Sequence, residues 1–222
     1  MDPSIIGIGT DSIGETHMKI AFIGSGHVGP ALAKLAIKAG HEVTLANRHG
    51  ADSLKDIVAG LGPKAKAVNL ADIAEGQDLI VLAVPYNQIK NIDSDLLRDK
   101  KVIDASNYFP QRDGQNTDLI THKIASSQLV ANHFHGSEVA KAFNTFSVAN
   151  LDSLAKAAGA PDRIVMTVAG DGEVKKIATD LISEIGFQPY DAGSLAESFK
   201  IQADGPIFGF QGTLDEITKK LA

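Results

Sequence analysis

The stretch that decides the fold is Lys19-Ile20-Ala21-Phe22-Ile23-Gly24-Ser25-Gly26-His27-Val28-Gly29. Its first five residues form a short apolar run, which is typical of a buried parallel strand. The three glycines that follow have the spacing GxGxxG. This spacing permits a tight turn, the close approach of a pyrophosphate to the backbone, and close packing of helix against strand. We therefore expect backbone amides after the strand to hold a phosphate group at the start of a helix.

The helix that such a motif requires is predicted directly after it. Apolar residues recur at helical spacing, namely Val28, Leu32, Leu35, Ala36 and Ala39. Gly40 is placed to end this helix. Because the motif lies between a strand and a helix, dinucleotide binding is favoured over an ordinary glycine turn. The predicted phosphate-binding residues are Gly24, Ser25, Gly26, His27, Val28 and Gly29.

Short apolar segments alternate with helical ones along the rest of the chain. The expected strands are 19–23, 42–46, 65–68, 78–83, 101–104, 139–144 and 163–168. Helices are expected after the first two strands, over 174–185, and twice within 195–222 with a division near Gly205-Pro206, whereas 107–121 is expected to be a long polar loop. This alternation predicts a doubly wound α/β fold of the Rossmann type with a mostly parallel sheet.

The chain is expected to hold one main domain. Residues 18–150 would form the dinucleotide-binding domain, and residues 151–222 a smaller C-terminal α/β segment packed on it. Residues 1–17, rich in Gly, Ser and Thr, are interpreted as a leader or tag remnant, or as a loosely ordered natural extension. A short C-terminal segment cannot bury its apolar helix faces alone, so a second copy is a possible partner and a homodimer is the expected assembly.

Composition excludes several classes of protein. With 21 Lys and Arg against 27 Asp and Glu in 222 residues, the formal charge is −6, which disfavours a nucleic-acid module. The 44% of apolar residues can supply a large core, and no apolar run approaches the ~18 residues of a bilayer span. Because the chain has no cysteine, disulfides and thiolate chemistry are excluded. No secretory signal is recognised in the sequence, so the cytoplasm is the expected location.

The end of the second expected strand indicates which dinucleotide is bound. Chains that bind NAD usually carry an acidic residue there, about 20 residues after the glycines, to contact the ribose hydroxyls. Here the sequence is Ala46-Asn47-Arg48-His49, without a carboxylate. Arg48 could donate two aligned hydrogen bonds to a 2′-phosphate and stack on adenine. We therefore predict NADP(H) as the coenzyme, with a solvated surface charge as the alternative role of Arg48.

Together these motifs resemble a known family. The chain is similar to the NADP oxidoreductases that use the deazaflavin coenzyme F420 and, less closely, to the nucleotide domain of six-transmembrane ferric reductases. The segments that carry the resemblance are Gly24 to Gly29, Asn47-Arg48, Val84-Pro85, Lys141-Ala142-Phe143-Asn144-Thr145 and Asp191-Ala192-Gly193. The resemblance implies hydride exchange between the nicotinamide C4 and the C5 of a bound deazaflavin (F420) or flavin (FMN or FAD).

The resemblance also implies roles for individual residues. Ser25, Asn47 and Arg48 would hold the phosphates and adenosine of NADP. The family carries a further basic residue soon after the arginine, where this chain departs from the pattern, and Lys55 or His49 could substitute for it. Ala83, Val84 and Pro85 would lie behind the nicotinamide. Such a hydride transfer needs little acid or base chemistry from side chains, because the protein mainly positions the rings and excludes water.

Four further residues have alternative interpretations. Lys141 and Asn144 could protonate and orient a carbonyl or imine substrate. On a strand they would point to opposite sides, which argues against a joint role. In the alternative interpretation, Lys141 is solvated and Asn144 fixes the backbone at the end of the strand. His133 and His135 would share one face of a strand and could contact the second cofactor; without a third ligand, no metal site is predicted. An NADP-binding module without turnover is the remaining alternative.

Overall fold

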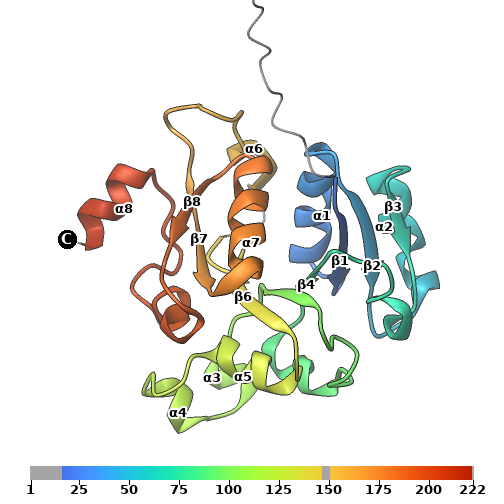
Figure 1. Ribbon diagram of the computed structural model, residues 1–222, viewed down its shortest axis with the longest axis horizontal. Coiled ribbons are helices and arrows are strands. Elements are labelled where there is room, and N and C mark those ends of the chain that lie inside the picture. Colours follow the sequence, from blue (N-terminus) through green and yellow to red (C-terminus); the bar gives the residue numbers. More distant parts are fainter. Residues whose placement is uncertain (1–16, 147–150, 222) are drawn as a thin grey trace, which may run out of the picture.

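The computed structural model describes residues 17–146 and 151–221. Within them, the strands form a single sheet in the order β3-β2-β1-β4-β5-β6-β7-β8 (Figure 1). The strands are β1 (Lys19–Ile23), β2 (Glu42–Ala46), β3 (Ala65–Ala67), β4 (Leu79–Leu82), β5 (Lys101–Asp104), β6 (Glu138–Ala142), β7 (Val165–Gly170) and β8 (Gln188–Asp191). Residues 1–16 of the expected leader, and the expected domain boundary near residue 150, lie outside the described residues.

The sheet is parallel at every pairing except one. From β3 to β6 all neighbours run in the same direction, β6 and β7 are antiparallel, and β7 and β8 are again parallel. The predicted doubly wound α/β fold is confirmed. Its strand order reverses between β1 and β4, and in open α/β sheets the crevice at the carboxyl ends of such a pair is where ligands bind.

Helices cover both faces of the sheet. The helices and 3-10 helices are α1 (Val28–Lys38), η1 (Ala51–Leu54), α2 (Lys55–Leu61), η2 (Leu70–Asp72), η3 (Tyr86–Asn91), α3 (Pro110–Asp113), α4 (Thr117–Ile120), α5 (Ser126–His133), α6 (Leu151–Leu154), α7 (Gly172–Glu184), η5 (Leu195–Ile201) and α8 (Leu214–Leu221). α1, α2, α6 and α7 pack on one face, and η3 and α5 on the other. None of the helices in residues 17–146 and 151–221 is long and apolar enough to cross a bilayer.

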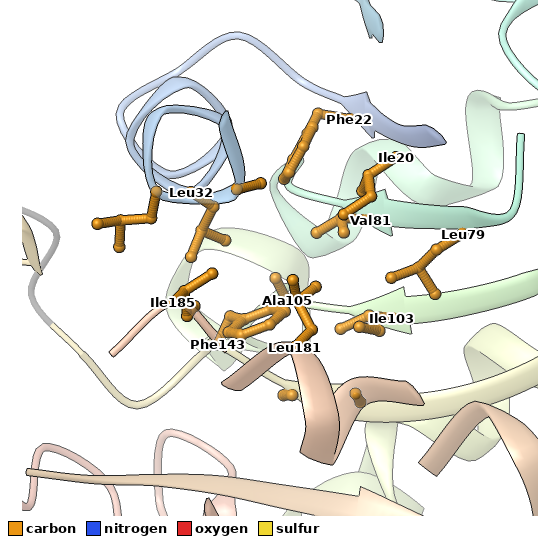
Figure 2. Close-up of a cluster of buried hydrophobic side chains, with 14 of the residues drawn as sticks. Ile20, Phe22, Leu32, Leu79, Val81, Ile103, Ala105, Phe143, Leu181 and Ile185 are labelled. Carbon is orange, nitrogen blue, oxygen red and sulfur yellow. The ribbon is translucent and has the colours of Figure 1, made fainter. Parts of the chain in front are cut away.

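Alternation along the strands divides the core into two layers. In β1, Ile20 and Phe22 belong to the cluster beneath α1 and α7, whereas Ala21 and Ile23 belong to the cluster on the opposite face. Figure 2 shows the first cluster, in which the β1 side chains meet Leu32 of α1 and residues near the end of α7. Burial on both faces explains why these strands are continuous apolar runs in the sequence.

The C-terminal segment is built into the same sheet. β7 pairs with β6, and α7 packs against β6, β7 and β8 on the face that also carries α1. Beyond β8, a third cluster of buried side chains joins Val165 of β7 to Ile201 of η5 and Ile217 of α8. Most of the apolar side chains of this segment are therefore covered within one chain, whereas Leu214 of α8 stays exposed.

Four expectations about local structure were wrong or incomplete. The expected loop at 107–121 contains the short helices α3 and α4, and α5 was not predicted. β8 was missed because Pro189, which cannot donate a backbone hydrogen bond, lies within it; proline is tolerated in a strand at the edge of a sheet. The two helices expected in 195–222 are η5, which is a 3-10 helix, and α8.

Candidate functional site

In the turn after β1, each of the three glycines is needed for a different structural reason. Gly24 has a φ of +116°, and a Cβ placed there would lie 2.3 Å from the carbonyl oxygen of Ala83. A Cβ on Gly29 would lie 2.1 Å from the carbonyl oxygen of Gly24. A Cβ on Gly26 would meet nothing within 4 Å, because this position faces open space. The first and third glycines thus allow the turn and the helix to pack, and the second leaves room for a ligand.

The start of α1 presents polar backbone groups next to this space. His27, the residue that precedes the helix, makes no side-chain capping hydrogen bond, and the first turn contains no acidic side chain. The first amide groups of a helix have no partner within the helix, and the helix dipole adds positive potential there. An anionic group seated over Gly26 would therefore be stabilised.

Asn47 joins the end of β2 to the glycine turn. Its Nδ2 donates to Ser25 Oγ at 2.9 Å and to Ser53 Oγ at 3.0 Å. Its Oδ1 accepts from the backbone N–H of His49 at 2.8 Å. These contacts hold the loop after β2 beside the loop after β1, so the two loops form one wall.

Arg48 lies exposed at the rim of this wall. Its Nε donates to Nε2 of the neighbouring His49 at 3.2 Å, and its Nη1 is 3.5 Å from Oε1 of Gln88 on η3, which is a weak contact. No ion pair to a carboxylate is recorded for Arg48 within the described part of the chain. The guanidinium therefore keeps donors that a phosphate could use.

A pocket of about 470 Å³ lies where the loops after β1, β2 and β4 meet. Its lining residues are Ile23, Gly24, Ser25, Gly26, Asn47, Arg48, His49, Leu70, Ala83, Val84, Pro85, Gln88, Asn91 and Ile92. None of these residues, all in the described part of the chain, carries a carboxylate. The pocket is at the reversal of strand order, so the chain places a cavity where dinucleotides bind in this class of sheet.

Most predicted coenzyme residues line this pocket, and several lining residues were not predicted. His27, Val28 and Gly29 lie at the start of α1 but are not among the lining residues. The lining residues that were not predicted are Ile23, Leu70, Gln88, Asn91 and Ile92. Gln88 and Asn91 belong to η3, whose contact with the pocket depends on how the chain turns after β4, and no motif in the sequence reports that turn.

Lys141 has no exposed surface, and the interpretation of it as a solvated side chain was wrong. Its Nζ donates to Asp104 Oδ2 at 3.2 Å and to the carbonyl oxygen of Ser106 at 3.0 Å. Asp104, which is level with Lys141 in the β5–β6 pairing, also accepts from Ser127 Oγ at 2.6 Å and from Ser106 Oγ at 2.6 Å. The network is buried between the strand ends and does not line the pocket.

Asn144 ties the end of β6 to two other segments. Its Nδ2 donates to Oδ1 of Asn107, after β5, at 3.0 Å and to the carbonyl oxygen of Ile201 at 2.6 Å. In return, Asn107 Nδ2 donates to the carbonyl oxygen of Asn144 at 2.9 Å. The expected strand ends earlier, at Ala142, because Phe143 adopts a φ of +65°. Phe143 thereby enters the core beside Ala105 and Leu181 (Figure 2).

Neither His133 nor His135 lies on a strand. His133 is the last residue of α5 and His135 lies in the following turn, so the expectation that they share a strand face was wrong. The His133 ring hydrogen-bonds through Nε2 to the carbonyl oxygen of Ile92 at 2.9 Å. Neither histidine lines the pocket. Within residues 17–146 and 151–221 there is no group of three potential metal ligands.

Tyr86 follows Pro85 at the start of η3 and stacks edge-on against Tyr108, with ring centroids 5.4 Å apart. Burial raises the pKa of its hydroxyl, and the carboxylate of Asp104 raises it further. The hydroxyl therefore stays protonated across the ordinary pH range. It serves as a neutral part of the structure around the carboxyl ends of β4 and β5.

Comparisons with known proteins agree with this geometry. Residues 19–108 match the model of the family "NADP oxidoreductase coenzyme F420-dependent". The chain is 31% identical in sequence to a hypothetical protein, SMa0349 from Sinorhizobium meliloti. The crystal structure of that protein matches this one with a TM-score of 0.76, and the match covers 90% of this chain and 97% of that one. A candidate F420-dependent NADP-reductase from Arthrobacter sp. FB24 is 25% identical, with a TM-score of 0.64 and coverage of 82% and 90%.

More distant proteins share parts of the chain or the fold alone. Rat metalloreductase STEAP3 is 27% identical over 190 residues, which is 83% of this chain but only 36% of that protein. The chain thus spans about a third of the length of this curated relative. An imine reductase from Aspergillus terreus is 16% identical with a TM-score of 0.59, covering 82% and 57%, which shows a common fold. With the family match across β1 to β5 and a relative that matches over nearly its full length, the chain belongs to the F420-dependent NADP oxidoreductase family.

Proposed function

We propose that the protein exchanges a hydride between C4 of NADP(H) and the C5 of a bound deazaflavin (F420) or flavin. The observation that carries the proposal is the pocket at the β1–β4 reversal, which combines the open space over Gly26 with Arg48 at its rim and has no carboxylate among its described lining residues. A 2′-phosphate would be repelled by an acid at this position and attracted by a guanidinium.

The residues present fit the coenzyme in each part of the pocket. The start of α1 and the space over Gly26 would hold the diphosphate. Ser25 and Asn47, already joined by a hydrogen bond of 2.9 Å, would contact the adenosine half, and Arg48 the 2′-phosphate. Ala83, Val84 and Pro85 would form the apolar wall behind the nicotinamide.

The chemistry needs positioning more than acid or base groups. When bound, NADPH supplies the hydride from C4 of its nicotinamide. The apolar wall of Val84 and Pro85 would hold the ring at the carboxyl edge of the sheet and keep water from one face. Asp104 and Lys141, which lie on β5 and β6, are fully buried and paired with each other. The proposal therefore assigns no proton transfer to a side chain.

The acceptor is identified by measuring NADPH oxidation with F420, FMN or FAD, each supplied alone. We expect turnover with at least one of them and none with NADPH by itself. A panel of carbonyls and imines, and a ferric chelate suggested by the metalloreductase relative, complete the assay. Turnover with a carbonyl or imine only would favour the alternative reductase. Tight NADPH binding without any acceptor would leave a nucleotide-binding module.

Coenzyme preference is tested by Arg48→Ala. Because Arg48 is exposed and makes only side-chain contacts, its removal should leave the fold intact. Loss of its charge-assisted hydrogen bonds should weaken NADPH binding by about 1 to 3 kcal/mol and leave NADH binding nearly unchanged. Calorimetric titration of both coenzymes measures the two effects, and equal weakening of both would contradict the assignment.

No observation favours a catalytic role for Lys141. Its ammonium group is enclosed by Asp104 and Ser106 and does not reach the pocket, so a substrate in the pocket could not contact it without rearrangement. Reduction of a carbonyl or imine through Lys141 is therefore the weaker proposal. The homodimer likewise stays a proposal, which sedimentation equilibrium would test.

A further inference from the structure

His49 stands at the rim of the pocket in contact with Arg48. Its backbone N–H is fixed by Asn47 Oδ1 at 2.8 Å, and its Nε2 lies 3.2 Å from Arg48 Nε. Both side chains line the pocket. A ligand group that reaches Arg48 therefore comes within reach of His49. The inference that follows rests on the proposed binding of NADP(H) and deepens it.

The positive charge at this rim is too small to balance a phosphate monoester. Such a group carries close to two negative charges at neutral pH. Arg48 is the one permanently charged residue among the described residues that line the pocket. Lys55, the next cation along the chain, pairs with Asp52 at 2.9 Å. A single guanidinium would therefore face a dianion, and a second positive group would add affinity that NADH cannot use.

The hydrogen bond between the two side chains sets the state of the imidazole. The Nε of arginine can only donate, so His49 Nε2 accepts and carries no proton. Phosphate oxygens without protons can only accept. Once a phosphate takes the donors of Arg48, the Nε2 of His49 loses its donor and faces an acceptor. A dianion at contact distance favours the charged form of the ring.

We propose that His49 is a second ligand of the coenzyme 2′-phosphate and takes up a proton from solvent when NADP(H) binds. In this exchange the Arg48–His49 hydrogen bond is broken, the proton adds to Nε2, and both side chains donate to the phosphate. Binding of NADP(H), but not of NAD(H), is thereby coupled to protonation of the protein.

Other charged groups near His49 do not reproduce this behaviour. The neighbouring segments η1, α2, η2 and η3 carry charged residues, none of which lines the pocket: Asp52, Lys55, Asp56, Asp72 and Lys90. His27 lies at the start of α1, beside the glycine turn. Any proton that His27 gains near the diphosphate is common to NADPH and NADH, so comparison of the two coenzymes removes it.

The test is isothermal titration calorimetry of NADPH and NADH in two buffers that differ in ionisation enthalpy, neither of them phosphate. At pH 7.5 histidine side chains are mostly neutral and a phosphate monoester is mostly dianionic, so proton release from the ligand is small. We expect the wild-type protein to take up roughly half a proton or more on binding NADPH, in excess of what it takes up on binding NADH.

Two variants isolate His49. His49→Gln should abolish the excess proton uptake and weaken NADPH roughly tenfold, with NADH within about twofold. His49→Lys, which is already charged, should keep NADPH affinity within about threefold of the wild type while also abolishing the excess uptake. Persistence of the excess uptake in His49→Gln, or unchanged NADPH affinity in it, would overturn the inference.

The outcomes also distinguish this inference from the proposed function. If the wild-type protein binds NADPH no more tightly than NADH, the proposed coenzyme assignment fails. If Arg48→Ala removes the preference for NADPH but His49→Gln changes neither affinity nor proton uptake, the assignment stands and the role of His49 falls. Phosphorus NMR of bound NADP⁺ gives a second readout, because the 2′-phosphate should stay dianionic to lower pH in the wild type than in His49→Gln.

Discussion

At the scale of single residues, the three glycines of the turn differ in what surrounds them. Gly29 faces the backbone of Gly24 at a distance that no Cβ tolerates, whereas Gly26 faces open space. The same substitution should therefore act on stability at one position and on ligand binding at the other.

We expect Gly29→Ala to lower the free energy of unfolding, because its Cβ would lie 2.1 Å from the carbonyl oxygen of Gly24. Gly26→Ala should keep wild-type stability and lose NADPH affinity, because its methyl group would occupy the space proposed for the diphosphate. Urea denaturation and coenzyme titration of both variants measure the two effects. Equal NADPH affinity in Gly26→Ala and wild type would place the diphosphate elsewhere.

A second residue-scale prediction concerns the buried pair of Lys141 and Asp104. Lys141→Met should destabilise the protein by about 3 to 5 kcal/mol, because it leaves an unpaired carboxylate in a fully buried site. Adding Asp104→Asn to the same chain should recover part of this loss, which urea denaturation measures. A stable Lys141→Met protein with more than a hundredfold loss of turnover would instead favour a catalytic lysine.

The sequence predicted residues whose role follows from local spacing. The glycines and Arg48 sit at fixed positions after two strands, and parallel strands bring their carboxyl ends to one edge. The burial of Lys141 could not be read in the same way. It depends on Ser127 and Ser106 reaching the same carboxylate from α5 and from the loop after β5, and neither contact has a signature in sequence.

At the scale of elements, η5 is closed by a capping box. The carboxylate of Glu197 accepts from the backbone N–H of Ser194 at 2.9 Å and from its Oγ at 3.1 Å. Lys200 donates to the same carboxyl group at 2.7 Å. η5 ends at Ile201, whose carbonyl oxygen accepts a hydrogen bond from the side chain of Asn144. The cap therefore supports a contact with the segment that follows β6.

The cap should make stability depend on pH in the acid range. The hydrogen bond from Lys200, followed by those from Ser194, lowers the pKa of Glu197 from 4.5 to about 2. A group whose pKa is lower in the folded state stabilises the protein above its unfolded pKa and loses that contribution as the pH falls toward the folded value. We therefore expect wild type to exceed Glu197→Gln in stability above about pH 5, with the difference vanishing between 4.5 and 2. Urea denaturation of both proteins across this range is the measurement, and a constant difference would contradict the lowered pKa.

Elements were predictable where apolar periodicity was strong. β1 and β4 are largely apolar runs, β2 and β5 carry shorter apolar stretches, and α1 and α7 have clear apolar faces, so their places were found. α5 was missed because its eight residues, SSQLVANH, have a short apolar face and a polar start. Its burial comes from packing against β6, which follows it, and against η5, which lies far away in the sequence.

At the scale of the whole molecule, ligand binding and folding are linked, because the pocket joins segments from 23 to 92 that are brought together only in the folded chain. At a concentration of NADPH one hundred times its dissociation constant, the folded state should gain about 2.7 kcal/mol. For a chain of this size that corresponds to a rise in melting temperature of roughly 5 to 11 °C. Thermal denaturation with NADPH, and with NADH at the same concentration, measures this rise in melting temperature, and Gly26→Ala is the control. Equal shifts with both coenzymes would argue against recognition of the 2′-phosphate.

The need of the C-terminal third of the chain for a packing surface could be anticipated, but the way it joins the sheet could not. Sequence reasoning expected residues 151–222 to need a partner surface, and β7 supplies one by pairing antiparallel with β6. An antiparallel pairing has no sequence marker here, because β7 is as apolar as the parallel strands. The argument for a homodimer from uncovered helix faces is correspondingly weaker, and the homodimer stays a prediction.

The contacts of residues 201 and 202 with the carboxyl end of the sheet have a consequence for synthesis. Asn144 binds the carbonyl oxygen of Ile201, and Oε1 of Gln202 accepts from the backbone N–H of Ser126. A ribosome delivers the residues that line the coenzyme pocket, which end at Ile92, roughly 5 to 20 s before it delivers Gln202, at ordinary elongation rates. All residues that line the pocket are therefore synthesised before the segment that contacts Asn144 and Ser126, so the C-terminal third of the chain is added after the strands that border the pocket are available.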